Sequence, residues 1–288
     1  MNPRDYNYQA SDMARFKLEV LLCNAIILAL FAYFIGTGEH LWLCLILLNI
    51  SLVRWMLAVH ELFHHCHSEQ LHPLIRSFLI PFSPLNIGYA EYQQLHAGHH
   101  AHTASEQDPD AFHIRGGHLR SLLGALRFPE QCSLHYVRQQ AGGYRPDAAV
   151  LARLSLFVLL AWWGGMAFWI MWLALRINYG IAVWVFFHHL HYRQQQYGTF
   201  ELPLPMLLQR GLALLYGKPA LLATMHHDVH HQWPKAAAWH LPTLRPLLIA
   251  IRDGASSDPT THQSGPRTVP ASAGTRAAAA SAQAKSAD

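Results

Sequence analysis

The most distinctive residues of this chain are histidines, which are gathered in short clusters. There are 22 histidines, against 17 aspartates and glutamates together, in 288 residues. Residues three or four positions apart lie on one face of a helix, so a cluster with that spacing directs several imidazoles to one side. Imidazoles arranged in this way are typical ligands of transition metals. The clusters with this spacing are His60-Glu-Leu-Phe-His64-His65, His96-Ala-Gly-His99-His100 and His227-Asp-Val-His230-His231.

Repetition of the spacing distinguishes a metal site from chance. One HxxxHH motif is followed by two HxxHH motifs. A single HxxHH indicates little, because a histidine-rich soluble helix or the polar end of a membrane helix has the same pattern. Three such motifs, all expected on one side of a membrane, favour a common metal site.

The number of imidazoles indicates two metal ions. A zinc site takes four ligands or fewer, and eight or nine imidazoles exceed that number. Few cysteines or methionines lie near the clusters, which argues against copper(I). A pair of ions held by imidazoles with open positions suits O₂ activation better than simple hydrolysis.

A further cluster, His188-His189-Leu190-His191, follows the last long apolar block. We expect His188 or His189 to supply one more ligand, without a choice between them, and His191 to lie in an interfacial belt. Carboxylates near the clusters can orient imidazoles by accepting their free N–H groups, although Glu106 is expected to be an ordinary solvated charge. The candidates are Glu61, Glu91, Glu106, Asp108, Asp110 and Asp228.

The composition is that of a membrane protein. Hydrophobic residues make up 52% and charged residues 13%, where soluble domains carry about 25% charged residues. The arginines are scattered, so no nucleic-acid partner is expected. The four cysteines form no CxxC pair and read as small core residues. The polar N-terminus does not resemble a signal peptide, so the first apolar run should remain as an anchor.

The apolar runs predict two helical hairpins. Residues 20–36 and 41–59 are each near the length of about 20 residues that a membrane helix needs. The block 154–187 would be about 51 Å long as one helix, which is too long for a single crossing. Its turn falls either at Gly164-Gly165, which we favour, or at Arg176-Ile177-Asn178. Residues 74–90 contain two prolines and are expected to be interfacial or re-entrant.

The predicted fold is therefore an all-α integral membrane domain. It has four transmembrane helices in two hairpins and a cytoplasmic helical cap that carries the histidine motifs. Residues 1–19 form an N-terminal arm, 20–252 the domain, and 253–288 a low-complexity, disordered tail. The distribution of Lys and Arg places the histidine motifs and both termini in the cytoplasm, and a bacterial inner membrane is the expected location.

The motifs resemble those of the membrane fatty acid desaturase superfamily, which includes hydroxylases and carotenoid ketolases. HELFHH, HAGHHAHTASEQDPDAFH and HHDVHHQWPKAAAWHLPTL are similar to its three histidine boxes, and the resemblance covers roughly residues 20–250. It implies a cytoplasmic non-haem diiron centre that uses O₂ and two electrons to attack an unactivated C–H bond. The implied ligands are His60, His64, His65, His96, His99, His100, His227, His230 and His231, with one of His188 and His189.

These ten candidates are more than two ions should need, and His65 is the first we would assign to a supporting role. The family that this chain resembles also includes members fused to a haem domain, and that domain carries the motif His-Pro-Gly-Gly. Here His72-Pro73 is followed by Leu74, so electrons are expected from a separate ferredoxin or cytochrome.

The expected substrate is a fatty acyl or other lipid chain, and the expected reaction is desaturation. Hydroxylation, ketolation and oxidative decarboxylation on the same scaffold stay open. A metal transporter or sensor is the non-enzymatic alternative, which the position of the clusters at the ends of apolar runs disfavours. Arg54 and Arg176 are expected to meet a headgroup or a partner carboxylate. Five tryptophans either line a chain tunnel or, for most of them, face lipid: Trp162, Trp163, Trp169, Trp172 and Trp184.

Overall fold

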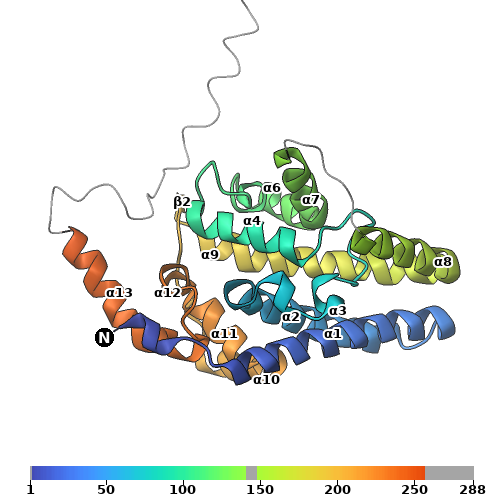
Figure 1. Cartoon of the computed structure of the whole chain (residues 1–288), viewed down its shortest axis with the longest axis horizontal. Helices are drawn as coiled ribbons and strands as arrows, with labels where there is room; N and C mark the ends of the chain where they lie inside the picture. Colours follow the sequence, from blue (N-terminus) through green and yellow to red (C-terminus); the bar gives the residue numbers. More distant parts are fainter. Residues whose placement is uncertain (1, 141–147, 257–288) are drawn as a thin grey trace, which may run out of the picture.

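A computed structural model describes residues 2–140 and 148–256 (Figure 1). In these ranges the chain is mostly helical. The described chain also contains a short antiparallel hairpin of two strands, β1 (Tyr192–Arg193) and β2 (Gln196–Tyr197). The predicted all-α class is confirmed for this part of the chain.

The first hairpin joins α1 (Ala10–Thr37) to α2 (Leu41–His65). Gly38 ends α1 in the left-handed region, with φ of 70°, and its N–H donates to the Phe34 carbonyl. A glycine adopts this conformation without a steric penalty. α1 begins ahead of the apolar run that starts at Val20, so residues of the predicted arm already belong to the first helix.

The second hairpin is formed by α8 (Ala148–Val183), which is interrupted at Gly165 with φ of 48° and ψ of −128°. The Phe157 ring lies 5.2 Å from the Phe168 ring and 6.2 Å from the Trp172 ring. In a straight helix Phe157 and Trp172 would be about 22 Å apart. The chain therefore reverses at Gly164-Gly165, the favoured of the two predicted turns.

The two reversals are neighbours. A Cβ on Gly164 would lie 2.8 Å from the Ile35 side chain, near the end of α1. Figure 1 shows both reversals at one end of the molecule, with α9 (His189–His191) and α12 (His227–Gln232) near the opposite end. The arrangement separates the apolar turns from the segments rich in histidine.

Three helices of the described chain are long and apolar enough to cross a membrane: α1, α2 and the continuous stretch Ala148–His191. The protein is an integral membrane protein. The last stretch contains the reversal at Gly165 and continues from α8 through η3 (Trp184–His188), a π-helical turn, into α9.

Short helices cover the ends of the long ones. The remaining elements, in chain order, are η1 (Pro3–Tyr6), η2 (Ser68–Gln70), α3 (Pro73–Arg76), α4 (Tyr89–His102), α5 (Ala111–Ile114), α6 (His118–Leu126), α7 (Phe128–Gln139), α10 (Met206–Tyr216), α11 (Lys218–Met225), η4 (Ala238–His240) and α13 (Leu241–Ser256).

The proline-containing segment 74–90 forms no spanning helix. After α3 it runs as irregular chain whose Phe78 and Phe82 side chains are buried in the core. The Arg153 guanidinium donates to the carbonyls of Asn86 and Ser77 and so attaches the segment to α8. This segment supplies one wall of the cavity described below.

The two arginines that were expected to meet a headgroup or a carboxylate, Arg54 and Arg176, both have carboxylate partners. Arg54 in α2 lies 2.5 Å from Glu19 in α1, and Arg176 in α8 lies 2.6 Å from Glu130 in α7. Pairing offsets the cost of removing a guanidinium from water. All four cysteines are buried and free, as predicted.

The N-terminal arm packs on the C-terminal part of the domain. Tyr8 is buried, and its hydroxyl accepts a hydrogen bond from the Ala238 N–H. The Ala237 N–H donates to the Tyr6 carbonyl. Of the predicted disordered tail, residues 257–288 lie outside the described residues, and α13 extends to Ser256.

Replacing Gly165 by alanine should destabilise the protein by about 1–3 kcal/mol, because a residue with a Cβ is strained in this backbone conformation. No atom lies within 4 Å of the added Cβ, so the change isolates the backbone effect. Gly36→Ala is the matched control, since Gly36 is helical and equally uncrowded and alanine is favoured in helices. Thermal unfolding in detergent measures both. Equal stability of the two variants would contradict the expectation.

Candidate metal centre

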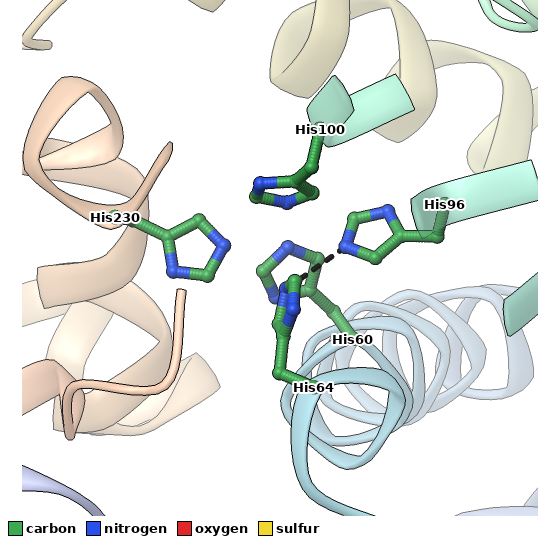
Figure 2. A group of neighbouring side chains, drawn as sticks. All are labelled: His60, His64, His96, His100 and His230. Atoms are coloured by element: carbon green, nitrogen blue, oxygen red, sulfur yellow. Dashed lines mark hydrogen bonds between the residues drawn. The ribbon is translucent and has the colours of Figure 1, made fainter. Parts of the chain in front are cut away.

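Five imidazoles from three helices converge on one point. His60 and His64 come from α2, His96 and His100 from α4, and His230 from α12. One nitrogen from each ring lies within 4.8 Å of the nitrogens of all the others. Figure 2 shows the rings gathered around a common space, with His96 Nε2 2.9 Å from His64 Nε2. We call these five residues group I.

Several nitrogens of group I have no hydrogen-bond partner although they are buried. They include Nε2 of His60, Nε2 of His230 and both ring nitrogens of His100. A buried polar group without a partner costs about 1–3 kcal/mol. A cation at the point of convergence would bind these lone pairs, so the residues of group I fit a metal ion.

Four further imidazoles form a second set, group II: His99 of α4, His191 of α9, and His227 and His231 of α12. His191 Nε2 lies 3.2 Å from His99 Nε2 and 3.1 Å from His227 Nε2, which lies 3.0 Å from His231 Nε2. Two nitrogens bound at right angles to one ion, each at about 2.1 Å, would be about 3.0 Å apart. Nitrogens of His99, His191 and His231 all lie within 4.8 Å of one another, which suits ligands sharing an ion, and His227 borders this set through His191 and His231.

The two groups are in direct contact. The ring of His100 in group I stacks on the ring of His231 in group II, with centroids 4.0 Å apart. Helices α4 and α12 each contribute to both groups. In each helix the two histidines four residues apart belong to the same group, and the histidine between them belongs to the other group, so the arrangement fits two neighbouring ions.

Hydrogen bonds to Nδ1 orient four of the nine rings. His99 Nδ1 lies 3.0 Å from both Asp108 oxygens, and His60 Nδ1 lies 3.2 Å from Glu61. His191 Nδ1 donates to the Gly198 carbonyl at 2.9 Å, and His231 Nδ1 lies 3.1 Å from the Thr103 hydroxyl. Holding the proton on Nδ1 leaves the Nε2 lone pair free for a metal.

Three of the other predicted carboxylates act elsewhere, whereas Asp110 lies beside His99. Glu91 accepts the Gly88 N–H at the start of α4, and Asp228 pairs with Arg245 and Arg252. The Glu106 side chain is 91% exposed, as expected of a solvated charge. Asp110 is buried 3.7 Å from His99 Nδ1, and burial raises the pKa of its carboxyl to about 7.

Burial also keeps most of these imidazoles neutral. It lowers the pKa of His96, His100, His227, His230 and His231 well below the usual value, and the neighbouring imidazoles add to the effect. For His99 burial acts in the same direction, but the Asp108 charge and hydrogen bond raise the pKa overall. Neutral imidazole is the form that binds metal.

The structure places His191, rather than the predicted His188 or His189, among the other imidazoles. His188 Nδ1 donates to the Ile114 carbonyl, and its Nε2 lies 3.1 Å from His118. His189 is partly exposed and packs against Trp184. The π-helical turn η3 is the reason, because an extra residue in the turn shifts which side chains face inward. The only feature of the sequence that could have identified His191 is its position three residues after His188.

His65 lies outside both groups. Its ring packs edge-on against Tyr8, 5.0 Å away, on the side of the N-terminal arm. The structure thus brings together eight of the nine histidines of the three boxes and adds His191. His65 is the residue that the sequence analysis singled out for a supporting role.

An apolar cavity of about 690 Å³, its open mouth included, borders group I. His60 and His96 line it, together with side chains of α2, α4, α7, α8 and the segment after α3. The five tryptophans considered for a tunnel do not line it, and Trp162 is 82% exposed. Trp55 of α2 lines the cavity instead. Sequence reasoning missed it because it lies within an apolar run.

A model of the fatty acid desaturase family matches residues 39–256. The chain belongs to this family. The matched region contains every residue of groups I and II and every residue that lines the cavity. No curated protein matches the chain significantly, nor does any solved structure. Family membership and the paired imidazole groups together support a membrane-bound oxidoreductase with a diiron-type site.

Replacing His191 by alanine should remove about one of two bound metal ions, because group II loses the nitrogen that faces two of its other members. His189→Ala is the matched control, since His189 lies two residues away and faces outward. Metal analysis of the purified protein measures the stoichiometry. Loss of metal in His189→Ala, with full occupancy in His191→Ala, would contradict the geometry.

Proposed function

We propose that the protein is an O₂-dependent, membrane-bound diiron oxidoreductase that desaturates a fatty acyl or similar lipid chain. The observation that carries the proposal is the contact between an apolar cavity and group I, which is one of two adjoining groups of converging imidazoles. Metal ligands alone would also suit a transporter or sensor. An apolar cavity whose wall includes two of the candidate ligands, His60 and His96, suits an apolar molecule that reacts there.

The proposed ligands are group I for one ion and group II for the other. In this assignment His188, His189 and His65 are not ligands. When bound, the iron pair supplies the reductive activation of O₂. Over the whole reaction O₂ takes two electrons from a donor and two electrons with two hydrogens from the substrate. With two further protons the products are an alkene and two waters.

The protein's own residues have three tasks in this proposal. Glu61, Asp108 and the Gly198 carbonyl hold the imidazole rings in the orientation that directs Nε2 inward. Burial favours the neutral form of His96, His100, His227, His230 and His231, which is the form that binds metal. The apolar cavity walls exclude water and hold the methylenes of the substrate next to the site. Small differences in this placement decide between alkene and alcohol.

We also propose the topology. Four membrane-spanning segments form two hairpins, with the turns on the far side and the histidine groups and both termini in the cytoplasm. The adjacent turns at Gly38 and Gly164 and the paired arginines support the arrangement. The functional domain then includes the packed N-terminal arm as well as the region from residue 20 to 252. A bacterial inner membrane and a separate ferredoxin or cytochrome donor complete the proposal.

Replacing His96, His99 or His230 by alanine should abolish product formation, by about 100-fold or more, because each removal opens a metal group. The protein is expressed in a host with a suitable electron donor, and total lipids are compared by mass spectrometry with and without the gene. His102→Ala is the matched control, since His102 is an exposed histidine of the same helix α4.

The mass of the product identifies the reaction. A product that has lost two hydrogens supports desaturation. A product that has gained one oxygen shows that the reaction is hydroxylation instead. Full activity in all three variants would overturn the diiron proposal. Binding of metal without O₂ consumption, under conditions that supply electrons and lipid, would favour a transporter or sensor.

A further inference from the structure

Two parts of the histidine motifs belong to neither metal group, and both contact the N-terminal arm. One is His65, the last histidine of the first motif, and the other is the segment 236–239, which follows the third motif. Both contact Tyr8. The match to the family model begins at residue 39, so the arm lies outside the matched region. The arm nevertheless joins two of the motifs that define the family.

Backbone hydrogen bonds hold the arm on the segment that follows α12. Asn7 and Ala236 form an antiparallel β-bridge, and the Ala237 N–H donates to the Tyr6 carbonyl at 2.8 Å. Figure 1 shows the start of the chain beside α13. Because α1 begins two residues after Tyr8, the backbone is fixed on both sides of this residue.

Aromatic rings fix the direction of the Tyr8 side chain. Its ring centroid lies 5.0 Å from that of His65, 4.9 Å from that of Trp239 and 5.3 Å from that of Phe16. All three contacts are edge-on, which is a favourable arrangement of aromatic rings. The hydroxyl of Tyr8 is therefore held at a defined place beside α2.

This hydroxyl connects the segment after α12 to Glu61 of α2. It accepts the Ala238 N–H at 3.0 Å, so its own proton is available for another acceptor. Burial raises the pKa of the Tyr8 hydroxyl, and the charge of Glu61 and a hydrogen bond to Glu61 raise that pKa further. The hydroxyl therefore keeps its proton and donates it to the carboxylate.

Glu61 connects the hydroxyl to group I. Its side chain is 3% exposed, and one of its oxygens lies 3.2 Å from His60 Nδ1. A buried carboxylate needs hydrogen-bond donors, and Tyr8 and His60 supply them. The Nε2 atom of His60 is buried and has no hydrogen-bond partner, and Figure 2 shows its ring among those of group I. A carboxylate held from behind in this way orients the imidazole that it contacts.

We propose that the N-terminal arm is part of the metal site and that Tyr8 is a positioning residue for the ion of group I. Through Glu61 the hydroxyl holds the His60 ring with Nε2 toward the ion. Through Ala238 it connects this ring to the segment that follows His230, another member of group I. The inference rests on the proposed ligands and not on the reaction that they serve.

Replacing Tyr8 by phenylalanine tests the hydroxyl alone, because the ring and its packing remain. The purified full-length protein in nanodiscs is stripped of metal and titrated anaerobically with Fe²⁺, and with Co²⁺, whose visible absorption reports on its ligands. One of the two ions should bind about tenfold more weakly, as is typical when a partner of a ligating imidazole is lost. The Co²⁺ absorption of that site should shift, because the His60 ring is no longer held.

Tyr33→Phe is the matched control. It removes the same hydroxyl from an exposed tyrosine near the end of α1, where Tyr33 contacts His40. This variant should bind both ions as the unmodified protein does. Unchanged affinity for both ions in Tyr8→Phe, or equal weakening of both, would overturn the proposal.

A double variant tests whether Tyr8 acts through Glu61. Glu61→Gln should also weaken one ion, and adding Tyr8→Phe to it should weaken that ion little further, because coupled residues have non-additive effects. Effects that multiply in the double variant would overturn the proposal. None of these measurements requires turnover. Selective weakening of one ion in Tyr8→Phe, with no product from any lipid in the unmodified protein, would support the role of the arm while refuting the proposed reaction.

Discussion

The constraint on which the structure depends is the burial of imidazoles that have no protein partner. Nine rings direct nitrogens toward one another at the edge of an apolar domain, and several of those nitrogens make no hydrogen bond. A buried polar atom without a partner destabilises a fold. The arrangement is therefore costly unless cations bind the lone pairs. Asp108, Glu61 and the Gly198 carbonyl contact the Nδ1 atoms of three rings and hold them in this orientation. The fold therefore supports the arrangement of imidazoles that a metal site needs.

The membrane helices provide the rigid support that such a site needs. Two hairpins turn at neighbouring glycines at one end of the molecule, and the histidines follow at the other end of the same helices. Because α2 carries His60 and His64 directly after its apolar part, the site and the cavity share one helix. The irregular segment after α3 closes the cavity from the side, and Arg153 and Arg176 attach it to α8 through its carbonyl groups.

The sequence by itself determined the class of fold and indicated a metal site made of imidazoles. Histidine spacing of three and four residues predicted metal binding, the count predicted two ions, and the apolar runs predicted two hairpins, with Gly164-Gly165 as the favoured turn. The structure shows the reversal at Gly164-Gly165 and the convergence of the histidines, because both depend on local rules, namely the freedom of glycine and the period of a helix. The family match is consistent with them.

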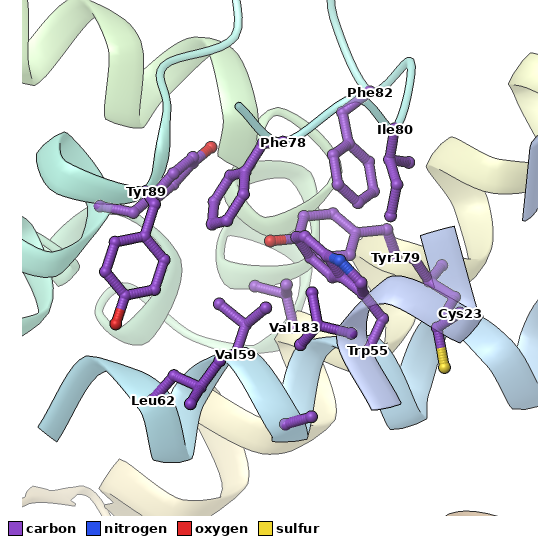
Figure 3. Packing of buried hydrophobic residues seen from close by; sticks show 14 of the residues in the cluster. Cys23, Trp55, Val59, Leu62, Phe78, Ile80, Phe82, Tyr89, Tyr179 and Val183 are labelled. Atoms are coloured by element: carbon purple, nitrogen blue, oxygen red, sulfur yellow. The ribbon is translucent and has the colours of Figure 1, made fainter. Parts of the chain in front are cut away.

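Only the tertiary structure decided which imidazoles meet. The choice of His191 over His188 and His189 depends on a π-helical turn, which changes the inward face of the chain and has no local sequence signature. The division of one helix's histidines between two groups depends on the helices packed against it. The same is true of Trp55, which is one of many apolar residues in α2 until the fold brings it beside Phe82 on the wall of the cavity (Figure 3). Contacts between distant segments determine these features, because the direction of a side chain and the shape of a cavity depend on how the helices pack.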